Sequence, residues 1–474
     1  MKNKLSILVV TIAFSILLSM VSLPQITASS SFQLPYDVEI AREEFAESLE
    51  TTTLNEGSLP EFVPFWVDLV NAEVVPNDGE GVYVAVLDTG LLNPWPFFFS
   101  EANIAWDLRK GFSHDIWWDS GIGDFEMGPL RDDRGVISHP WGSGHGTHVT
   151  STIVGYNINN VFWVRGVAPE ATIIPVLVLD YWWLDCPDPN YDVDGDGVSD
   201  CHDGKVLFRG GTDEMISAGI YYVADLAETL DGPVIISMSL GGSSPSPMIE
   251  DAIDYAIDLG VIVVAAAGNL GYLGMDWPGA YPQVISCAAG GWTMNWIGTG
   301  GTWWLSDVSE DLREDDYWGN NWQLYLEDFS SRPNMDIGQK ATDLDVTTPG
   351  AAVVGPHQPF VSWDGTQWNL GEINYYYVWG TSQATPHVSA MAALILESSP
   401  ELGQYAMQWI LKNAAAGLPI PSDGAWVYDP WYGLYHFEWF GIDWGRGFLQ
   451  ADSAMSVAHI FMRGSRSQHF LVPE

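Results

Sequence analysis

The chain has 474 residues, and its 61 acidic and 17 basic side chains give a formal net charge of −44. A surface this acidic repels polyanions, which argues against nucleic acid as a partner. The length fits one large domain with insertions or two to three ordinary domains. Halophilic solvation, calcium binding and life in acid each account for the charge, although 24 Trp residues fit poorly with a strongly halophilic surface.

The N-terminus carries Lys2 and Lys4, followed by an apolar run from residue 5 to about 23 and a small-residue segment at 27–29. This order is typical of a secretory signal peptide, so we expect residues 1–28 to be removed and the protein to be secreted and extracellular, with no membrane association. The alternative is an uncleaved membrane anchor, because the run approaches the length that spans a bilayer.

Residues 29–60 are polar and acidic, with a helical stretch near 41–49, and we interpret them as a pro-segment or N-terminal extension. From residue 61 to 462 the chain alternates strand-like and helical runs without a linker, which predicts one domain, followed by a C-terminal tail at 463–474.

The strand-like runs are nearly continuous in Val, Ile and Ala, as expected for strands buried on both faces. The helical runs repeat apolar residues at three and four positions. The sequence therefore predicts an α/β fold, a doubly wound and mostly parallel sheet with helices on both faces. Predicted strands are 82–87, 172–179, 234–238, 261–266 and 284–288, and predicted helices are 213–227, 248–259 and 382–396.

Two insertions, 180–211 and 292–345, interrupt this alternation. Surface structure that does not touch the substrate is the favoured interpretation, and loops over a cleft are the alternative. Trp pairs occur in these insertions or in long loops, and we expect them to pack the loops rather than to form a binding platform. The pairs are Trp117 and Trp118, Trp182 and Trp183, and Trp303 and Trp304.

Three runs supply the residue types of a nucleophilic catalytic set. Asp88 ends the apolar run V-Y-V-A-V-L-D-T-G, His145 lies in G-S-G-H-G-T-H-V, and Ser382 lies in G-T-S-Q-A-T-P-H-V. A serine hydroxyl needs an imidazole to remove its proton, and the imidazole needs a carboxylate to fix its tautomer and stabilise its cation. His148 and His387, beside the motif positions, are expected to have packing or hydrogen-bonding roles.

The three runs, in the order Asp, His, Ser, resemble the signatures of the subtilisin-like serine proteases (the subtilase family), in particular its extracellular archaeal or bacterial members. The resemblance extends over about residues 81–458 and implies a subtilisin-like fold. It also implies a monomeric serine endopeptidase that acts on polypeptide substrates, with Ser382 as nucleophile, His145 as base and Asp88 as orienting acid. An exopeptidase of the same fold, or an inactive secreted binding protein, are the alternatives.

The same resemblance assigns further site residues. Asn269, after the apolar run V-I-V-V-A-A-A-G, matches the oxyanion asparagine, and the backbone N–H of Ser382 is the second donor. The run S-M-S-L-G-G matches the strand that pairs with substrate, and small residues near Asn269 predict a roomy apolar slot. The substrate-binding residues are Ser239, Leu240, Gly241, Ala265, Ala267 and Gly268.

The run D-V-D-G-D-G-V-S-D-C-H-D places acidic residues at alternate positions around a glycine turn. Oxygen ligands in this pattern are what Ca²⁺ prefers, so we predict a structural calcium loop; a solvated acidic turn is the alternative. Its ligands would be Asp192, Asp194, Asp196, the Val198 carbonyl, Asp200 and Asp203.

Cys186 and Cys201 bracket most of this loop, and secretion permits their oxidation, so we predict a disulfide. Cys287 is left over in an apolar run and is expected to be buried and reduced.

Gln383 follows the predicted nucleophile, where the family usually has an oxidisable Met. We therefore expect the natural protein to keep its activity longer in hydrogen peroxide than the variant Gln383→Met, measured as residual hydrolysis after timed exposure. Equal inactivation rates of the two proteins would contradict this expectation.

Overall fold

The computed structural model describes residues 59–119, 124–137, 143–186, 190, 199, 201–202, 204–297, 300–305, 308, 323–359, 362–363, 368–369, 371–415, 424–430 and 433–468. The predicted signal peptide, nearly all of the predicted pro-segment and the end of the predicted tail lie outside these residues.

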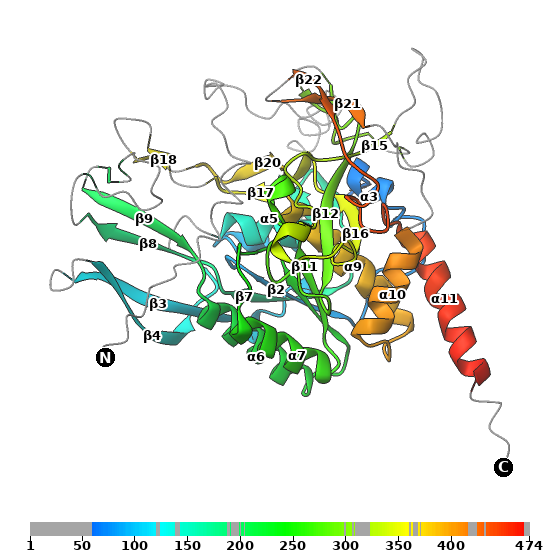
Figure 1. Cartoon of the computed structure of the whole chain (residues 1–474), viewed down its shortest axis with the longest axis horizontal. Helices are drawn as coiled ribbons and strands as arrows, with labels where there is room; N and C mark the ends of the chain where they lie inside the picture. Colours follow the sequence, from blue (N-terminus) through cyan, green and yellow to red (C-terminus); the bar gives the residue numbers. More distant parts are fainter. Residues whose placement is uncertain are drawn as a thin grey trace, which may run out of the picture.

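One large, mostly parallel sheet forms the centre of the fold (Figure 1). Neighbours from β12 to β7 run parallel, whereas the edge strands β15 and β4 run antiparallel to their partners. The order is β15 (Leu324–Leu326), β12 (Ile285–Trp292), β11 (Ile262–Ala266), β10 (Val234–Met238), β2 (Tyr83–Asp88), β7 (Thr172–Leu177), β3 (Lys110–Asp119) and β4 (Asp124–Arg134), and β16 (Val346–Pro349) also pairs with β12.

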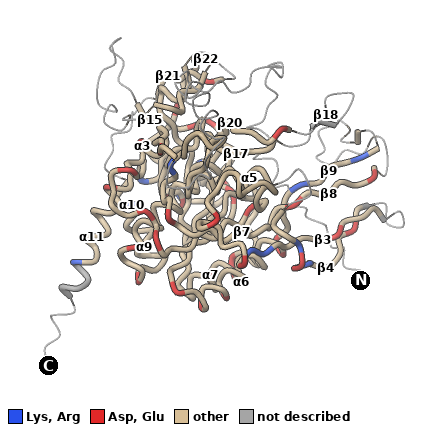
Figure 2. Tube along the Cα trace, turned by 180° about the vertical axis from the view of Figure 1, so that it is seen from behind, with Lys and Arg blue, Asp and Glu red and all other residues tan. Residues whose placement is uncertain are grey.

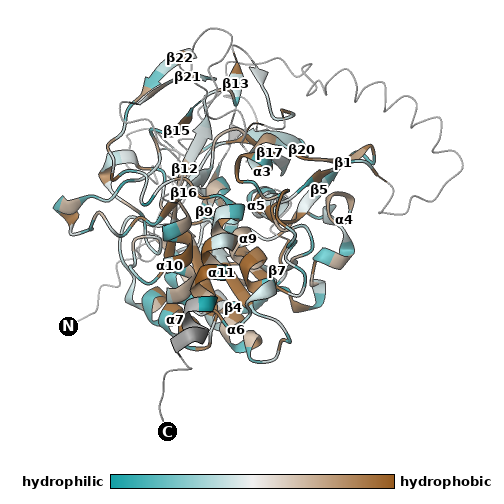
Figure 3. Cartoon of the chain, turned by 90° about the vertical axis from the view of Figure 1, so that its right-hand side faces the viewer, coloured by the Kyte–Doolittle hydropathy of each residue, from teal (hydrophilic) through white to brown (hydrophobic). Residues whose placement is uncertain are grey.

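Side chains of the central strands alternate between two hydrophobic cores. Val84 and Val86 of β2 belong to one core, and Ala85 and Leu87 of the same strand belong to the other. Helices α6 (Asp213–Ala227) and α7 (Pro247–Asp258) cover one face, and α5 (Gly144–Val154) and α9 (Thr381–Ser398) cover the other. The doubly wound α/β fold predicted from the sequence is therefore confirmed, and hydrophobic residues concentrate in the middle of the molecule around α9 (Figure 3).

Capping residues fix where the helices of the first face begin. The Thr212 hydroxyl accepts a hydrogen bond from the backbone N–H of Met215 at the start of α6. Ser246 caps α7 in the same way, with Pro247 as its first residue. After α7 the chain passes through Gly260 with φ +86°, a left-handed conformation that glycine adopts without strain.

The remaining helices are short or peripheral. Helix α10 packs against α11 and the edge of the sheet, and α11 extends away from the body (Figure 1). Their bounds are α3 (Phe65–Leu69), α4 (Trp95–Phe98), α10 (Gln404–Ala415) and α11 (Ala451–Gln468).

Small sheets surround the central one. They are β1 (Glu61–Phe62) with β6 (Phe162–Arg165) and β5 (Gly155–Ile158); β8 (Asp180–Asp185) with β9 (Lys205–Gly210); β13 (Trp296–Ile297) with β14 (Gly300–Gly301); β17 (Val353–His357) with β20 (Asn374–Val378); β18 (Ser362–Trp363) with β19 (Trp368–Asn369); and β21 (Ala425–Asp429) with β22 (Gly433–Phe437).

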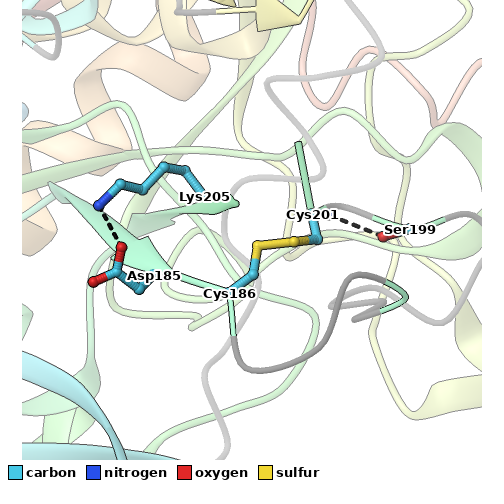
Figure 4. The surroundings of a disulfide bond; sticks show 5 residues. All are labelled: Asp185, Cys186, Ser199, Cys201 and Lys205. Atoms are coloured by element: carbon cyan, nitrogen blue, oxygen red, sulfur yellow. Dashed lines mark hydrogen bonds and ion pairs between the residues drawn. A yellow bond between two sulfur atoms is a disulfide. The ribbon is translucent and has the colours of Figure 1, made fainter. Parts of the chain in front are cut away.

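The insertion predicted at 180–211 begins and ends as the hairpin β8–β9, which packs on the β3–β4 hairpin through a small apolar cluster that includes Phe125 and Phe208. A disulfide joins Cys186 to Cys201, as predicted, just beyond the end of β8 (Figure 4). Trp117 and Trp118 lie in β3 and not in a long loop, because this segment is paired along its whole length with β4.

Two neighbouring Trp residues of the Trp-rich insertion differ in their burial. Trp303 is buried against Phe62 and Phe162, as expected for a packing residue, whereas Trp304 is 40% exposed. Acidic residues are spread over many of the described elements (Figure 2). None of the described helices combines the length and apolarity needed to cross a membrane.

A buried ion pair joins α10 to the central sheet. The carboxylate of Asp345, which immediately precedes β16, accepts hydrogen bonds from Lys412 Nζ, from Gln408 Nε2 at 2.9 Å and from the Ser286 backbone N–H at 3.1 Å. The Asp345 side chain is 1% exposed, and burial raises its pKa although Lys412 favours the charged form. Removing Lys412 would leave this carboxylate without its cation.

We therefore expect Lys412→Met to lower the free energy of unfolding by about 3–5 kcal/mol, measured by urea denaturation at pH 7. Lys205→Met is the matched control, because its ion pair with Asp185 is exposed to solvent and contributes less than about 1 kcal/mol. Equal losses in the two variants would contradict a structural role of the buried pair.

Candidate active site

The predicted acid and base are in contact at the carboxyl edge of the central sheet. Asp88 is the last residue of β2 and is fully buried. His145, the second residue of α5, places its Nδ1 at 2.8 Å from Asp88 Oδ1 and 2.9 Å from Oδ2. The carboxylate thus holds the imidazole in one orientation and leaves Nε2 as the nitrogen directed away from it.

The residues around His145 explain how α5 approaches β2 so closely. A Cβ added to Gly146 would lie 2.4 Å from the Gly90 carbonyl oxygen and 3.1 Å from Asp88 Oδ1, so only glycine fits at this position. The backbone N–H of Gly146 donates to Thr89 Oγ1 at 3.0 Å, and the Leu92 N–H donates to the Thr147 hydroxyl at 2.8 Å. These bonds tie the start of α5 to the chain that leaves β2.

Ser382 is the second residue of α9, and its side chain is held against the segment that follows β10. Its hydroxyl donates to the Ser239 carbonyl oxygen at 3.2 Å, and the Ser239 hydroxyl donates back to the Ser382 carbonyl at 2.7 Å. Helix α9 packs against α5, which carries His145. The hydrogen bonds found among the described residues do not include one between Ser382 and His145, and such bonds are often loose before substrate binds.

Asn269 lies beside the start of α9. Its Oδ1 accepts hydrogen bonds from the backbone N–H and from the hydroxyl of Thr381, each at 2.9 Å. A Cβ added to Gly380 would lie 3.6 Å from the Ser382 backbone nitrogen and 3.7 Å from Asn269 Nδ2. The two predicted oxyanion donors are therefore both within 4 Å of one point next to the predicted nucleophile.

The predicted substrate-binding residues lie on two adjacent segments at the same edge of the sheet. Ser239, Leu240 and Gly241 follow β10, whereas Ala265, Ala267 and Gly268 lie at the end of β11 and just after it. All six are buried.

Sequence analysis missed Arg332, whose guanidinium organises the loop behind Asn269. It is 2% exposed, donates from Nε to Asp443 Oδ2 at 3.2 Å and donates from NH1 to the Asp328 and Ser330 carbonyls at 2.7 and 3.0 Å. In the same loop, the Ser331 N–H donates to the Gly268 carbonyl at 2.9 Å and the Ser331 hydroxyl accepts from the Leu270 N–H at 3.0 Å. An Arg within an acidic insertion is not a local signal for this role.

His148 and His387 are buried and make hydrogen bonds, as predicted. His148 Nε2 lies 3.2 Å from the Val353 carbonyl oxygen, and His387 Nδ1 lies 2.8 Å from that of Gln383. Burial lowers the pKa of His148 well below its usual value and lowers that of His387 to about 3. Burial also lowers the pKa of His357, which stands behind α5, to about 4, so all three are neutral at pH 7.

The six predicted calcium ligands all lie outside the described residues. In the described part of the chain, His, Cys, Asp and Glu side chains form no cluster of three that could hold a metal. Cys287 is buried and unpaired as predicted, with its Sγ 3.0 Å from Thr348 Oγ1, and burial raises its pKa to about 12.

Relatives of known name align with most of the chain. Subtilisin from Bacillus sp. (strain TA39) is 30% identical over 68% of this chain and 58% of its own length. Fervidolysin from Fervidobacterium pennivorans is 27% identical over 76% of this chain, which spans 40% of that longer protein. Subtilisin BL from Lederbergia lenta is 27% identical over 75% of this chain and 92% of its own length.

The fold has solved counterparts as well. The S41 psychrophilic protease superposes with a TM-score of 0.50 at 25% identity, covering 83% of this chain and 99% of that one. Residues 79–425 match the sequence pattern of the subtilase family. This range contains Asp88, His145, Asn269 and Ser382. The chain therefore belongs to the subtilase family.

Proposed function

We propose that this chain is a secreted serine endopeptidase that hydrolyses peptide bonds through an acyl-enzyme on Ser382. The observation that carries the proposal is the contact of His145 Nδ1 with the buried carboxylate of Asp88. His145 lies on α5, which packs against α9, the helix that bears Ser382. Membership of the subtilase family supports the same reaction class.

In the proposed reaction, Asp88, His145 and Ser382 each have one role. Asp88 accepts a hydrogen bond from the Nδ1–H of His145, so that Nε2 carries a lone pair able to take a proton. The Ser382 hydroxyl exchanges its bond to the Ser239 carbonyl for one to His145 Nε2, and its oxygen then attacks the substrate carbonyl. The proton taken by His145 passes to the leaving amine, and water hydrolyses the acyl-enzyme by the same proton transfers in reverse.

Negative charge that develops on the attacked carbonyl oxygen needs donors fixed in advance. Asn269 Nδ2 and the Ser382 backbone N–H are suited to this role because both lie close to one point beside Gly380. Thr381 engages the oxygen end of the Asn269 amide through two hydrogen bonds and thereby orients the NH₂ end. No reorganisation of the amide is then needed during the reaction.

The segments after β10 and β11 would hold an extended polypeptide. Their backbone groups supply hydrogen bonds for a substrate strand, which is a recognised mode of peptide binding. Both segments, at Ser239–Gly241 and Ala265–Gly268, follow central strands of the sheet.

Calcium, secretion and monomeric state belong to the same proposal. The aspartates of residues 192–203 supply hard oxygen ligands around Gly197, and the disulfide between Cys186 and Cys201 closes most of that segment. A bound Ca²⁺ would stabilise the insertion without taking part in catalysis. The N-terminal sequence supports export, and the enzyme would act as a monomer on polypeptides outside the cell.

Cleavage of internally quenched peptides that are blocked at both ends tests the proposal. The natural protein should cleave them, whereas Ser382→Ala should lose about a thousandfold or more of the activity, because no other group supplies the nucleophile. Hydrolysis of only unblocked peptides would favour the exopeptidase. No hydrolysis by a folded, fully processed natural protein would favour an inactive binding protein.

Asn269→Asp should lower kcat by about 100- to 1,000-fold with little change in KM, the range seen when subtilisin loses its asparagine donor. This variant keeps the oxygen that accepts from Thr381 and removes the NH₂ group. Thr381→Val serves as the control, since it removes only the hydroxyl contact with the amide and should cost less. A loss of less than about threefold in Asn269→Asp would refute the role.

A further inference from the structure

An acidic side chain, Asp276, lies between the two proposed substrate-binding segments. A Cβ added to Gly268 would lie 2.4 Å from Asp276 Oδ2, and one added to Gly241 would lie 2.6 Å from Asp276 Cβ. Gly241 belongs to the segment after β10, and Gly268 to the segment after β11. The carboxyl group thus occupies space that side chains on these two segments would otherwise fill.

Backbone hydrogen bonds fix Asp276 in this position. Its N–H donates to the Ala267 carbonyl at 2.8 Å, and its own carbonyl accepts from the Ala280 N–H at 2.9 Å. The next residue, Trp277, exchanges two 2.8 Å bonds with Gly242. The chain at Asp276 is therefore tied to both segments, and Gly268, with φ +102°, is held in a conformation that other residues rarely adopt.

The location relative to Asn269 indicates which substrate residue would meet this carboxylate. Gly268 immediately precedes Asn269, the proposed donor to the attacked carbonyl oxygen. The substrate residue that contains this carbonyl is here called the acyl-side residue. Its side chain is attached to the carbon next to the carbonyl carbon that is attacked. Placed beside Gly268 in this way, that side chain would enter between the segments that contain Gly241 and Gly268.

We propose that Asp276 makes the enzyme select Lys or Arg as the acyl-side residue. This inference rests on the proposed function and names its substrate class. Asp276 is 1% exposed, and a carboxylate removed from water is stabilised when a cation is brought beside it. The long alkyl stems of Lys and Arg can pack along apolar surface while their charged ends reach the acid.

The sequence predicted a roomy apolar slot here, and this proposal places an acid in it. The small residues Ala265, Ala267 and Gly268 are present as expected, but Gly268 packs against an acid from a later part of the chain. The net charge of −44 adds a general attraction for cationic substrates, which would increase their rate of association.

The test is a panel of doubly blocked, internally quenched peptides that differ only at the acyl-side residue, with Arg, Lys, norleucine, Leu or Phe. Norleucine matches the length of the Lys stem without its charge. The natural protein should give kcat/KM values about 10- to 100-fold higher for Arg and Lys than for norleucine. Equal values for Lys and norleucine would overturn the inference without the need for any variant.

Asp276→Asn then tests the residue itself, because the amide keeps the shape and removes the charge. It should lower kcat/KM for Arg and Lys to about the norleucine level and leave norleucine unchanged. Asp345→Asn is the matched control: it removes another buried carboxylate, at the opposite edge of the sheet, and should not change the ratio. An unchanged Lys-to-norleucine ratio in Asp276→Asn would overturn the role of Asp276.

The two proposals fail in different ways. Cleavage that depends on Ser382 but shows no preference for Arg or Lys would refute the specificity and leave the proposed function standing. If none of the panel is cleaved, the proposed function fails and the specificity fails with it.

Discussion

The contact between Asp88 and His145 is the constraint on which the rest of the site depends. A buried carboxylate at the end of a parallel strand needs a hydrogen-bonding partner, and here that partner is the imidazole at the start of α5. Since the carboxyl ends of the parallel strands meet at one edge, the segments after β2, β10 and β11 come together there. The start of α9 completes the group by bringing Ser382 to the same edge.

Close approach of backbone to backbone is what makes this assembly possible. Gly146 lets α5 reach β2, and Gly241 and Gly268 leave room for the side chain of Asp276. In each case a Cβ would overlap with another atom, so sterics explain why glycine occupies these positions. Glycine, which has no side chain, therefore stands at the points of the site where the packing is tightest.

The sequence predicted best what depends on local pattern. The helix at 213–227 matches α6 at both ends, because its apolar periodicity is a local signal. Strand β3 was missed because its polar and aromatic residues become a strand only by pairing with β4. Motifs alone indicated the residues of the proposed triad. The contacts of Arg332 and Asp276 join distant parts of the chain, and no local pattern encodes them.

The most direct measurement for the central claim is labelling of the processed protein with a fluorophosphonate, followed by peptide mapping in a mass spectrometer. The account predicts one stoichiometric adduct, on Ser382, because this is the hydroxyl that His145 activates in the proposed mechanism. His145→Ala should suppress the adduct while the protein stays folded. An adduct on another serine, or none on the natural protein, would contradict the account.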